Sequence, residues 1–127
     1  MIKTSFINQI AIMVTCTAAR TAALSLPETE EKSHFEKPDF RVKKKIFAVL
    51  HENKNAMVIK LTAIDQDVFC SFDKEIIYPV AGGWGRQGWT FINLKKVRKE
   101  MFIDALTTAW KTVAGAKLSE KYFGKEE

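Results

Sequence analysis

The sequence predicts an α+β two-layer sandwich, in which an antiparallel sheet packs against helices on one of its faces. Three observations lead to this expectation. Helical patterns stand at the beginning, middle and end of the chain, short alternating segments lie between them, and turn residues join those segments. With 127 residues, the chain has the length of one domain and can bury a core without a disulfide or a metal.

The first expected helix covers residues 10–24, which contain neither Gly nor Pro, and it should end before Pro27. Residues 1–20 loosely imitate a secretion signal, because Lys3 precedes a mildly apolar run. Polar residues interrupt this run and Arg20 follows it closely, which favours the start of an amphipathic helix over a cleaved signal. No segment reaches the ~18–20 apolar residues of a membrane span, so we expect no membrane association.

The middle of the chain is typical of short antiparallel strands. Residues 27–32 (PETEEK) are expected to form an acidic connector. Three or four strands are expected between residues 34 and 60, because Phe, Val and Ile alternate there with polar residues. The turns between them should be Lys43-Lys44 and residues 52–55 (ENKN), where asparagine tolerates left-handed backbone angles.

The second half of the chain predicts two helices and two strands. Thr62 is a good N-cap for a short helix. The apolar stripe of this helix consists of Ile64, Val68 and Phe72. Strands are expected at residues 76–80 and 89–94, and the strongest helical pattern covers residues 95–115, with Gly115 as its C-cap. The expected stripe of that last helix consists of Val97, Met101, Ala105, Trp110 and Val113.

The net charge of +5 is unevenly distributed. Residues 41–60 hold six basic residues against one acid, and residues 81–99 hold five basic residues and no acid. Residues 28–40 and 61–80 are each acidic on balance. If the fold brings the two basic blocks together, the patch would attract nucleic-acid phosphates without reading base sequence. The alternative is that the lysines only keep the surface soluble.

The segment GGWGRQGWT, residues 82–90, holds four of the six glycines and two of the three tryptophans. In a functional interpretation, the glycines let backbone approach a ligand, Trp84 stacks on a base and Arg86 pairs with a phosphate. In a structural interpretation, the segment is a tight connection whose tryptophans pack on the helix of Trp110 and whose arginine meets a carboxylate. Trp89 begins a strand and is expected in the core, while both interpretations remain open for the other two side chains.

The second candidate site is the tip of a basic hairpin. Its residues are Arg41, Lys43, Lys44 and Lys45. If the hairpin is a wing, its tip would lie along a phosphate backbone, and the alternative is an ordinary solvated turn. Lys60 stands between apolar residues of a strand, and we expect its side chain to extend to the sheet edge, the alternative being that it lines a site.

We find no pattern that indicates catalysis, a metal or a cofactor. The two histidines, His34 and His51, stand in no His-Glu-x-x-His or Cys/His motif, and no nucleophile has an evident triad. Cys16 and Cys70 lie far apart and are expected to be buried, reduced thiols in helices, which fits a reducing cytoplasm. We therefore expect a protein that is not an enzyme.

Four segments together resemble the MmcQ/YjbR family over about residues 15–118. They are ALSLPETEEKSHFEKPDFRVKKKIFAVL, VIKL, YPVAGGWGRQGWTFINL and ALTTAWKTVA. The resemblance implies an α-β(3)-α-β(2)-α fold of the secretion-chaperone-like type in a small bacterial cytoplasmic protein without enzymatic activity. The family is commonly labelled DNA-binding on the strength of a winged sheet geometry. Residues 1–14 would then be an N-terminal extension or helix start, and residues 119–127 a C-terminal tail.

The sequence departs from the family pattern in two places. Family members usually begin close to the first helix, so residues 1–12 look like an extension, and Met13 is an alternative start to Met1. At the hairpin tip, where the family often has glycine, this chain has Lys43 and Lys44, which make the tip more basic.

Our leading expectation is weak, salt-dependent DNA binding by a monomer through phosphate contacts. The expected contact residues are Arg41, Lys43, Lys44, Lys45 and Arg86, with Trp84 as a stacking group. The competing expectation is a protein-binding or chaperone-like module that uses an apolar face around Trp84 and the sheet. A small-molecule pocket beside the glycine loop is a third.

Overall fold

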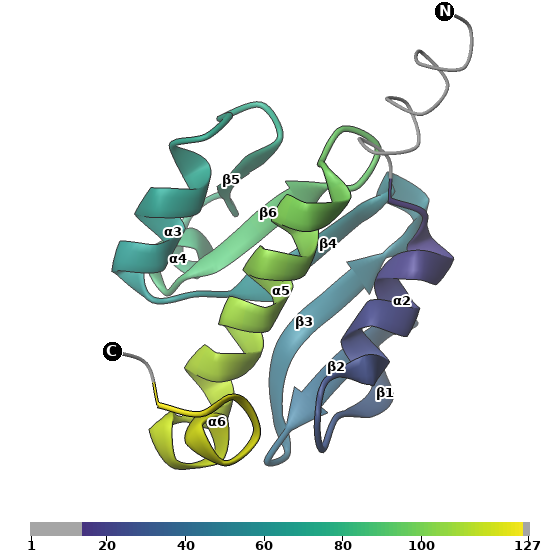
Figure 1. Ribbon diagram of the computed structural model, residues 1–127. Helices are drawn as coiled ribbons and strands as arrows, with labels where there is room; N and C mark the ends of the chain where they lie inside the picture. Colours follow the sequence, from purple (N-terminus) through teal and green to yellow (C-terminus); the bar gives the residue numbers. More distant parts are fainter. Residues whose placement is uncertain (1–13, 126–127) are drawn as a thin grey trace, which may run out of the picture.

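The computed structural model describes residues 14–125 and has an α+β fold, with one antiparallel sheet packed against helices (Figure 1). The strands in this range are β1 (Glu30–His34), β2 (Lys37–Val42), β3 (Lys45–His51), β4 (Ala56–Lys60), β5 (Ile77–Pro79) and β6 (Trp89–Asn93). The helices are α2 (Cys16–Ser25), the 3-10 helix η1 (Glu52–Lys54), α3 (Ala63–Cys70), α4 (Gly83–Arg86), α5 (Lys99–Ala114) and α6 (Ala116–Phe123). Among them, no helix is long and apolar enough to cross a membrane.

The strand order β1-β2-β3-β4-β6-β5 decides where the loops lie, because every neighbouring pair is antiparallel. The last residues of β2, β4 and β5 and the first residues of β3 and β6 therefore share one end of the sheet. The β2–β3 turn and the loop between β5 and β6, which contains α4, both leave the sheet at that end. We call it the loop end.

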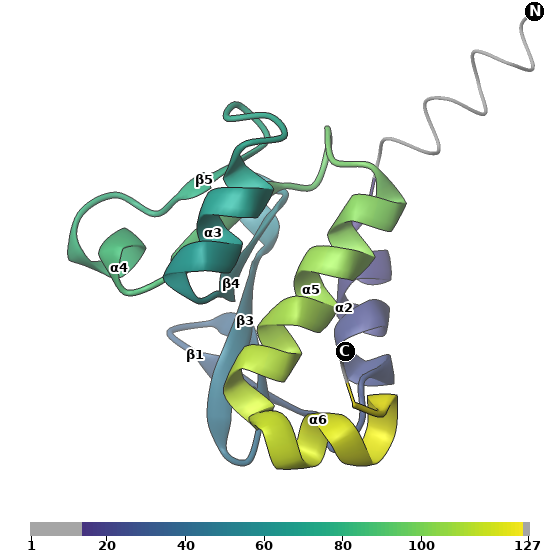
Figure 2. The same cartoon turned by 60° about the vertical axis from the view of Figure 1, so that its left-hand side comes forward.

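The two faces of the sheet differ in what covers them. Along β6, Thr90 and Ile92 are buried, whereas Trp89 and Phe91 point to the opposite face and are half-buried. Helices α2 and α5 pack on the buried side (Figure 2). Helix α3 lies there too, because Gln66 donates a hydrogen bond of 3.1 Å to the Thr90 hydroxyl. No helix in residues 14–125 covers the other face, which we call the open face.

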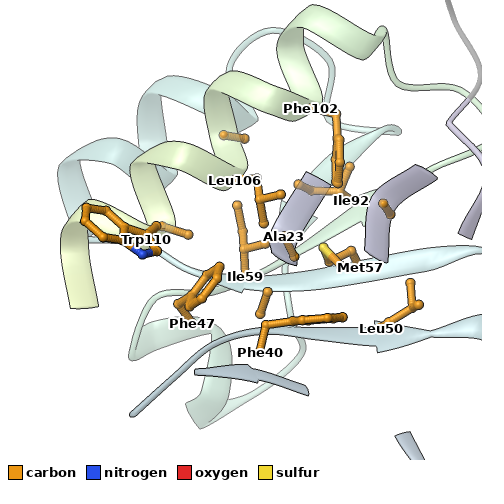
Figure 3. Packing of buried hydrophobic residues seen from close by; sticks show 14 of the residues in the cluster. Ala23, Phe40, Phe47, Leu50, Met57, Ile59, Ile92, Phe102, Leu106 and Trp110 are labelled. Carbon is orange, nitrogen blue, oxygen red and sulfur yellow. The ribbon is translucent and has the colours of Figure 1, made fainter. Parts of the chain in front are cut away.

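The core fills the space between the sheet and α5 (Figure 3). Its largest side chain is that of Trp110, which is fully buried and donates an indole hydrogen bond of 2.9 Å to the Pro27 carbonyl. The buried face of α5 consists of Phe102, Ala105, Leu106, Ala109, Trp110 and Ala114. Two residues of the apolar stripe predicted for α5, Ala105 and Trp110, lie on this buried face. Val97 is buried but precedes the helix, because Arg98 is the N-cap.

Several local predictions are confirmed. Helix α2 ends at Ser25, before Pro27, while residues 10–13 of the expected helix lie outside the described residues. Thr62 caps α3, since its hydroxyl accepts a hydrogen bond of 3.1 Å from the Asp65 amide. Asn55 has a left-handed φ of 49° in its turn, and Gly115 ends α5 with a φ of 86°.

Four elements were not predicted: the short helices η1 and α4, which lie in an expected turn and an expected loop, and the elements β1 and α6. Strand β1 occupies part of the expected acidic connector, and its residues, EEKSH, show no apolar alternation, so only its pairing with β2 defines it. Helix α6 begins directly after Gly115, in a stretch where we expected the domain to end and a tail to follow. Its Tyr122 and Phe123 rings pack edge-on against Trp110, at centroid distances of 6.4 and 5.4 Å.

Replacing Trp110 with Ala tests this arrangement of the core. We expect the free energy of unfolding to fall by about 3–5 kcal/mol, because the change leaves a cavity, removes the contact with α6 and leaves the Pro27 carbonyl without its donor. Urea denaturation measures the change. The matched control is Trp84→Ala. Because the Trp84 side chain is 64% exposed, this change should lower the free energy of unfolding by about 0.5 kcal/mol or less. Equal costs for the two variants would contradict the assignment of the core.

Candidate nucleic-acid interface

The two predicted sites lie at the same end of the sheet, the loop end. The midpoints of the β2–β3 turn and of the β5–β6 loop are three strand spacings apart, about 14 Å before the twist of the sheet is counted. Lys43, Lys44, Lys45 and Arg86 are all exposed, and none forms an ion pair with a carboxylate of residues 14–125. The fold therefore brings four cations of the two basic blocks to one end of the molecule.

The hairpin tip holds its lysines in an unfavourable backbone conformation. Lys43 and Lys44 have φ angles of 53° and 67°, both in the left-handed region. A two-residue turn of this kind favours Asn-Gly, because left-handed angles cost about 1–2 kcal/mol for an ordinary residue. The tip thus presents two exposed cations at a position where smaller residues would be more stable.

Arg41, by contrast, is engaged by a buried acid. Its Nε and terminal nitrogen donate to the two carboxylate oxygens of Asp39 at 2.9 and 3.1 Å, and Asp39 is fully buried. This hydrogen bonding raises the pKa of the Arg41 guanidinium above its ordinary value. A phosphate that displaced Asp39 would leave a buried carboxylate unpaired, at considerable cost. Arg41 therefore supports the hairpin rather than extending from it.

Two glycines of the β5–β6 loop are required by the fold. Gly88 has a φ of 103°, and a Cβ there would overlap the Leu61 carbonyl oxygen. Its own carbonyl accepts a hydrogen bond of 2.9 Å from the Leu61 amide. A Cβ on Gly85 would overlap the Val80 carbonyl oxygen, whereas Gly83 has room for one. Close backbone packing accounts for Gly85 and Gly88, as the structural interpretation of this loop expects.

The tryptophans of this loop do not pack as the structural interpretation expects. Trp84 is 64% exposed on α4, and Trp89 points to the open face, so neither lies in the core with Trp110. The prediction that Trp89 is buried is wrong, because alternation shows that two faces exist but not which of them the helices cover. Arg86 meets no carboxylate of the described residues, which leaves it and Trp84 available to a ligand.

Lys60 joins the loop to the sheet instead of extending to an edge. Its ammonium donates a hydrogen bond to the Gln87 carbonyl and lies 5.4 Å from the centroid of the Trp89 ring. Lys60 and Trp89 are register partners on β4 and β6. A lysine within an apolar strand indicates that its ammonium has a specific partner. The sequence does not show which strand pairs with β4, so this partner could not be predicted.

Other shifted pKa values each have a structural cause. Burial raises the pKa of the Cys16 and Cys70 thiols, which are free and half-buried, and lowers the pKa of His51. A hydrogen bond to Glu28 raises the pKa of the Tyr122 hydroxyl. Within residues 14–125, no three His, Cys, Asp or Glu side chains gather as a metal site would require.

A second surface, which we call the α3 surface, emerges only from the structure. The stripe predicted for this helix faces solvent: Ile64 and Val68 on α3 are 77 and 50% exposed, and Phe72, which lies two residues beyond the end of the helix, is 64% exposed. Only Phe69 of α3 is buried. Beside Phe72, a hollow of about 370 Å³ is lined by apolar side chains such as Ile76 and Met101 and also by the basic Lys96 and Arg98. The spacing of the stripe predicts the helix correctly but does not show that it faces away from the core.

Comparison with known proteins agrees with this architecture. The model of the YjbR family matches residues 24–112, and the chain therefore belongs to the YjbR family. Its fold is shared by the crystal structure of DR2400 from Deinococcus radiodurans, a protein with a DUF419 domain. The two chains are 18% identical and superpose with a TM-score of 0.70, over 90% of this chain and 91% of that one. No curated protein matches the sequence at a significant level.

Substitution of Gly88 tests the role of the loop glycines. We expect Gly88→Ala to lower the free energy of unfolding by at least about 2 kcal/mol, because a methyl group would strain the positive φ and push the loop away from Leu61. Gly83→Ala, where space is open, is the matched control and should change stability by no more than about 0.5 kcal/mol. Chemical denaturation of both variants decides the matter. A Gly88→Ala protein as stable as its control would overturn the structural role of this glycine.

Proposed function

We propose that this YjbR-family protein binds nucleic acid, and DNA in particular, through phosphate contacts at the loop end, and that it acts as a binding protein rather than an enzyme. The observation that carries the proposal is the gathering of Lys43, Lys44, Lys45 and Arg86 at one end of the sheet without acidic partners. Trp84, exposed on the same loop, offers an aromatic surface to a base.

Contacts of this kind set the expected strength of binding. Cations that neutralise phosphates release counterions, which makes affinity independent of base sequence and strongly dependent on salt. Four contacts predict a slope of log K against log salt near about −3.6 on duplex DNA, and a Kd of roughly 10⁻⁴–10⁻⁶ M at physiological salt. The protein should therefore bind DNA weakly and without a preferred sequence.

The variant Lys43→Asn/Lys44→Gly tests the hairpin without weakening it. It removes two cations and supplies the residues that the left-handed turn favours, so it should be at least as stable as the native protein. We expect its duplex affinity at low salt to fall by at least tenfold and its salt slope to become shallower by about 1.8. Fluorescence anisotropy with a labelled duplex measures both quantities.

The matched control removes the same charge from the opposite end of the sheet. Lys95 and Lys96 follow β6 and are both exposed, so Lys95→Asn/Lys96→Asn has the same net charge as the hairpin variant. Its affinity should stay within about twofold of the native value if contacts are local. An equal loss in both variants would show that only net charge matters, and absence of binding at low salt would refute the proposal.

A second candidate function, protein binding, is favoured by the α3 surface. Ile64 and Val68 on α3, together with Phe72 two residues after its end, form a row of large exposed apolar side chains that is typical of an interaction surface. Asp65 and Asp67 lie on the same helix, so the helix suits an apolar partner with basic residues, while Lys96 and Arg98 line the hollow beside Phe72.

Replacing Ile64 and Phe72 with Gln tests whether these apolar side chains stabilise the folded domain. Both side chains are mostly exposed, so we expect the free energy of unfolding of the double variant to lie within about 1 kcal/mol of the native value. Thermal and urea denaturation provide the measurement. A loss above about 2 kcal/mol would show that the stripe stabilises the domain itself, and protein binding would lose its supporting observation.

A further inference from the structure

The open face of the sheet carries a continuous row of side chains that no described helix covers. The register of the strands aligns one residue from each strand in this row, which consists of Lys32, Asp39, Val49, Val58, Phe91 and Tyr78. The acid in this row, Asp39, is fully buried and paired with Arg41, so it adds no exposed negative charge to the face. Towards β5 the row becomes aromatic, and Lys60 and Trp89 lie next to it, nearer the loop end.

The aromatic part of the open face is already arranged as a stack. The rings of Tyr78 and Phe91 are parallel within 19°, and their centroids are 4.7 Å apart. Because β5 is the edge strand, no strand lies beyond Tyr78, which is 38% exposed. Trp89 is two residues from Phe91 on the same strand and is half-buried, with the Lys60 ammonium over its ring. Another flat ring could extend the stack outward from Tyr78.

We propose that the open face binds the bases of single-stranded nucleic acid, which stack on Tyr78 and Trp89 while phosphates of the same strand meet the cations of the loop end. This inference rests on the proposed function and adds the class of nucleic acid to it. Bases inside a duplex are stacked on one another, and only an unpaired strand can offer them to a sheet. Aromatic side chains on a basic sheet surface are a common means of binding such strands.

The charge of the surface favours nucleic acid over a protein partner here. Lys60 lies directly over one of the aromatic rings, and the loop end with Lys43 and Arg86 adjoins the Trp89 side of the face. The α3 helix carries Asp65 and Asp67 beside its apolar side chains, so the helix itself is less suited to phosphates. On the open face, a stack of two aromatic rings, a lysine over a third ring and the basic loop end occur together.

Three labelled probes test the inference: a short single strand of mixed sequence, the duplex made from it, and an abasic strand with the same number of phosphates. We expect the native protein to bind the single strand at least tenfold more tightly than either other probe, because stacking adds to the phosphate contacts. In Tyr78→Leu/Trp89→Leu, the affinity for the single strand should fall to that of the abasic strand. Phe72→Leu, on the α3 surface, is the matched control and should change nothing.

The possible results separate this inference from the proposed function. Equal affinity for all three probes, or an unchanged preference in the double variant, overturns base stacking on the open face and leaves phosphate binding in place. Absence of binding to every probe overturns the proposed function and this inference with it. Circular dichroism checks that the double variant is folded, and Tyr78→Leu alone, at an exposed edge position, repeats the test should the Trp89 change disturb the loop.

Discussion

The pairing of β4 with β6 is the constraint on which the rest of the structure depends. It joins the hairpins of the first half to the helix, loop and strand of the second, and continues beyond the strands in the hydrogen bond from Leu61 to Gly88. Because this pairing is antiparallel, it brings the β5–β6 loop to the same end of the sheet as the Lys43-Lys44 turn. Cations of two basic blocks about forty residues apart in the sequence thus lie at the same end of the sheet.

The same sheet separates the molecule into surfaces of different chemistry. One face is buried under α2, α3 and α5, and the other presents aromatic rings and Lys60 next to the basic loop end. The exposed stripe of α3 lies among acidic residues. A phosphate backbone and a basic protein partner would therefore approach different parts of the protein, and the proposed functions do not compete for one site.

The sequence predicts the features that depend on local chemistry. Thr62 as a cap, Gly115 as a helix end and the Lys43-Lys44 turn each follow from neighbouring residues, and all three are found. Features that depend on distant contacts were missed. Strand β1 exists through its pairing with β2, α6 is held against Trp110, and Trp89 faces away from the core because the helices cover the other side. The site residues named from the sequence stay a prediction, and the engagement of Arg41 by buried Asp39 was not foreseen among them.

The most direct test of the central claim is a titration followed by the backbone amide NMR signals of the protein. A short unlabelled single strand is added at low salt, and the shifted signals are mapped on the structure. We predict that they cluster at residues 43–45, in the loop of residues 82–88 and on the open face around Phe91, and that those of α3 and of Lys95 and Lys96 stay in place. Shifts centred on α3, or spread evenly over the surface, would contradict a nucleic-acid site at the loop end.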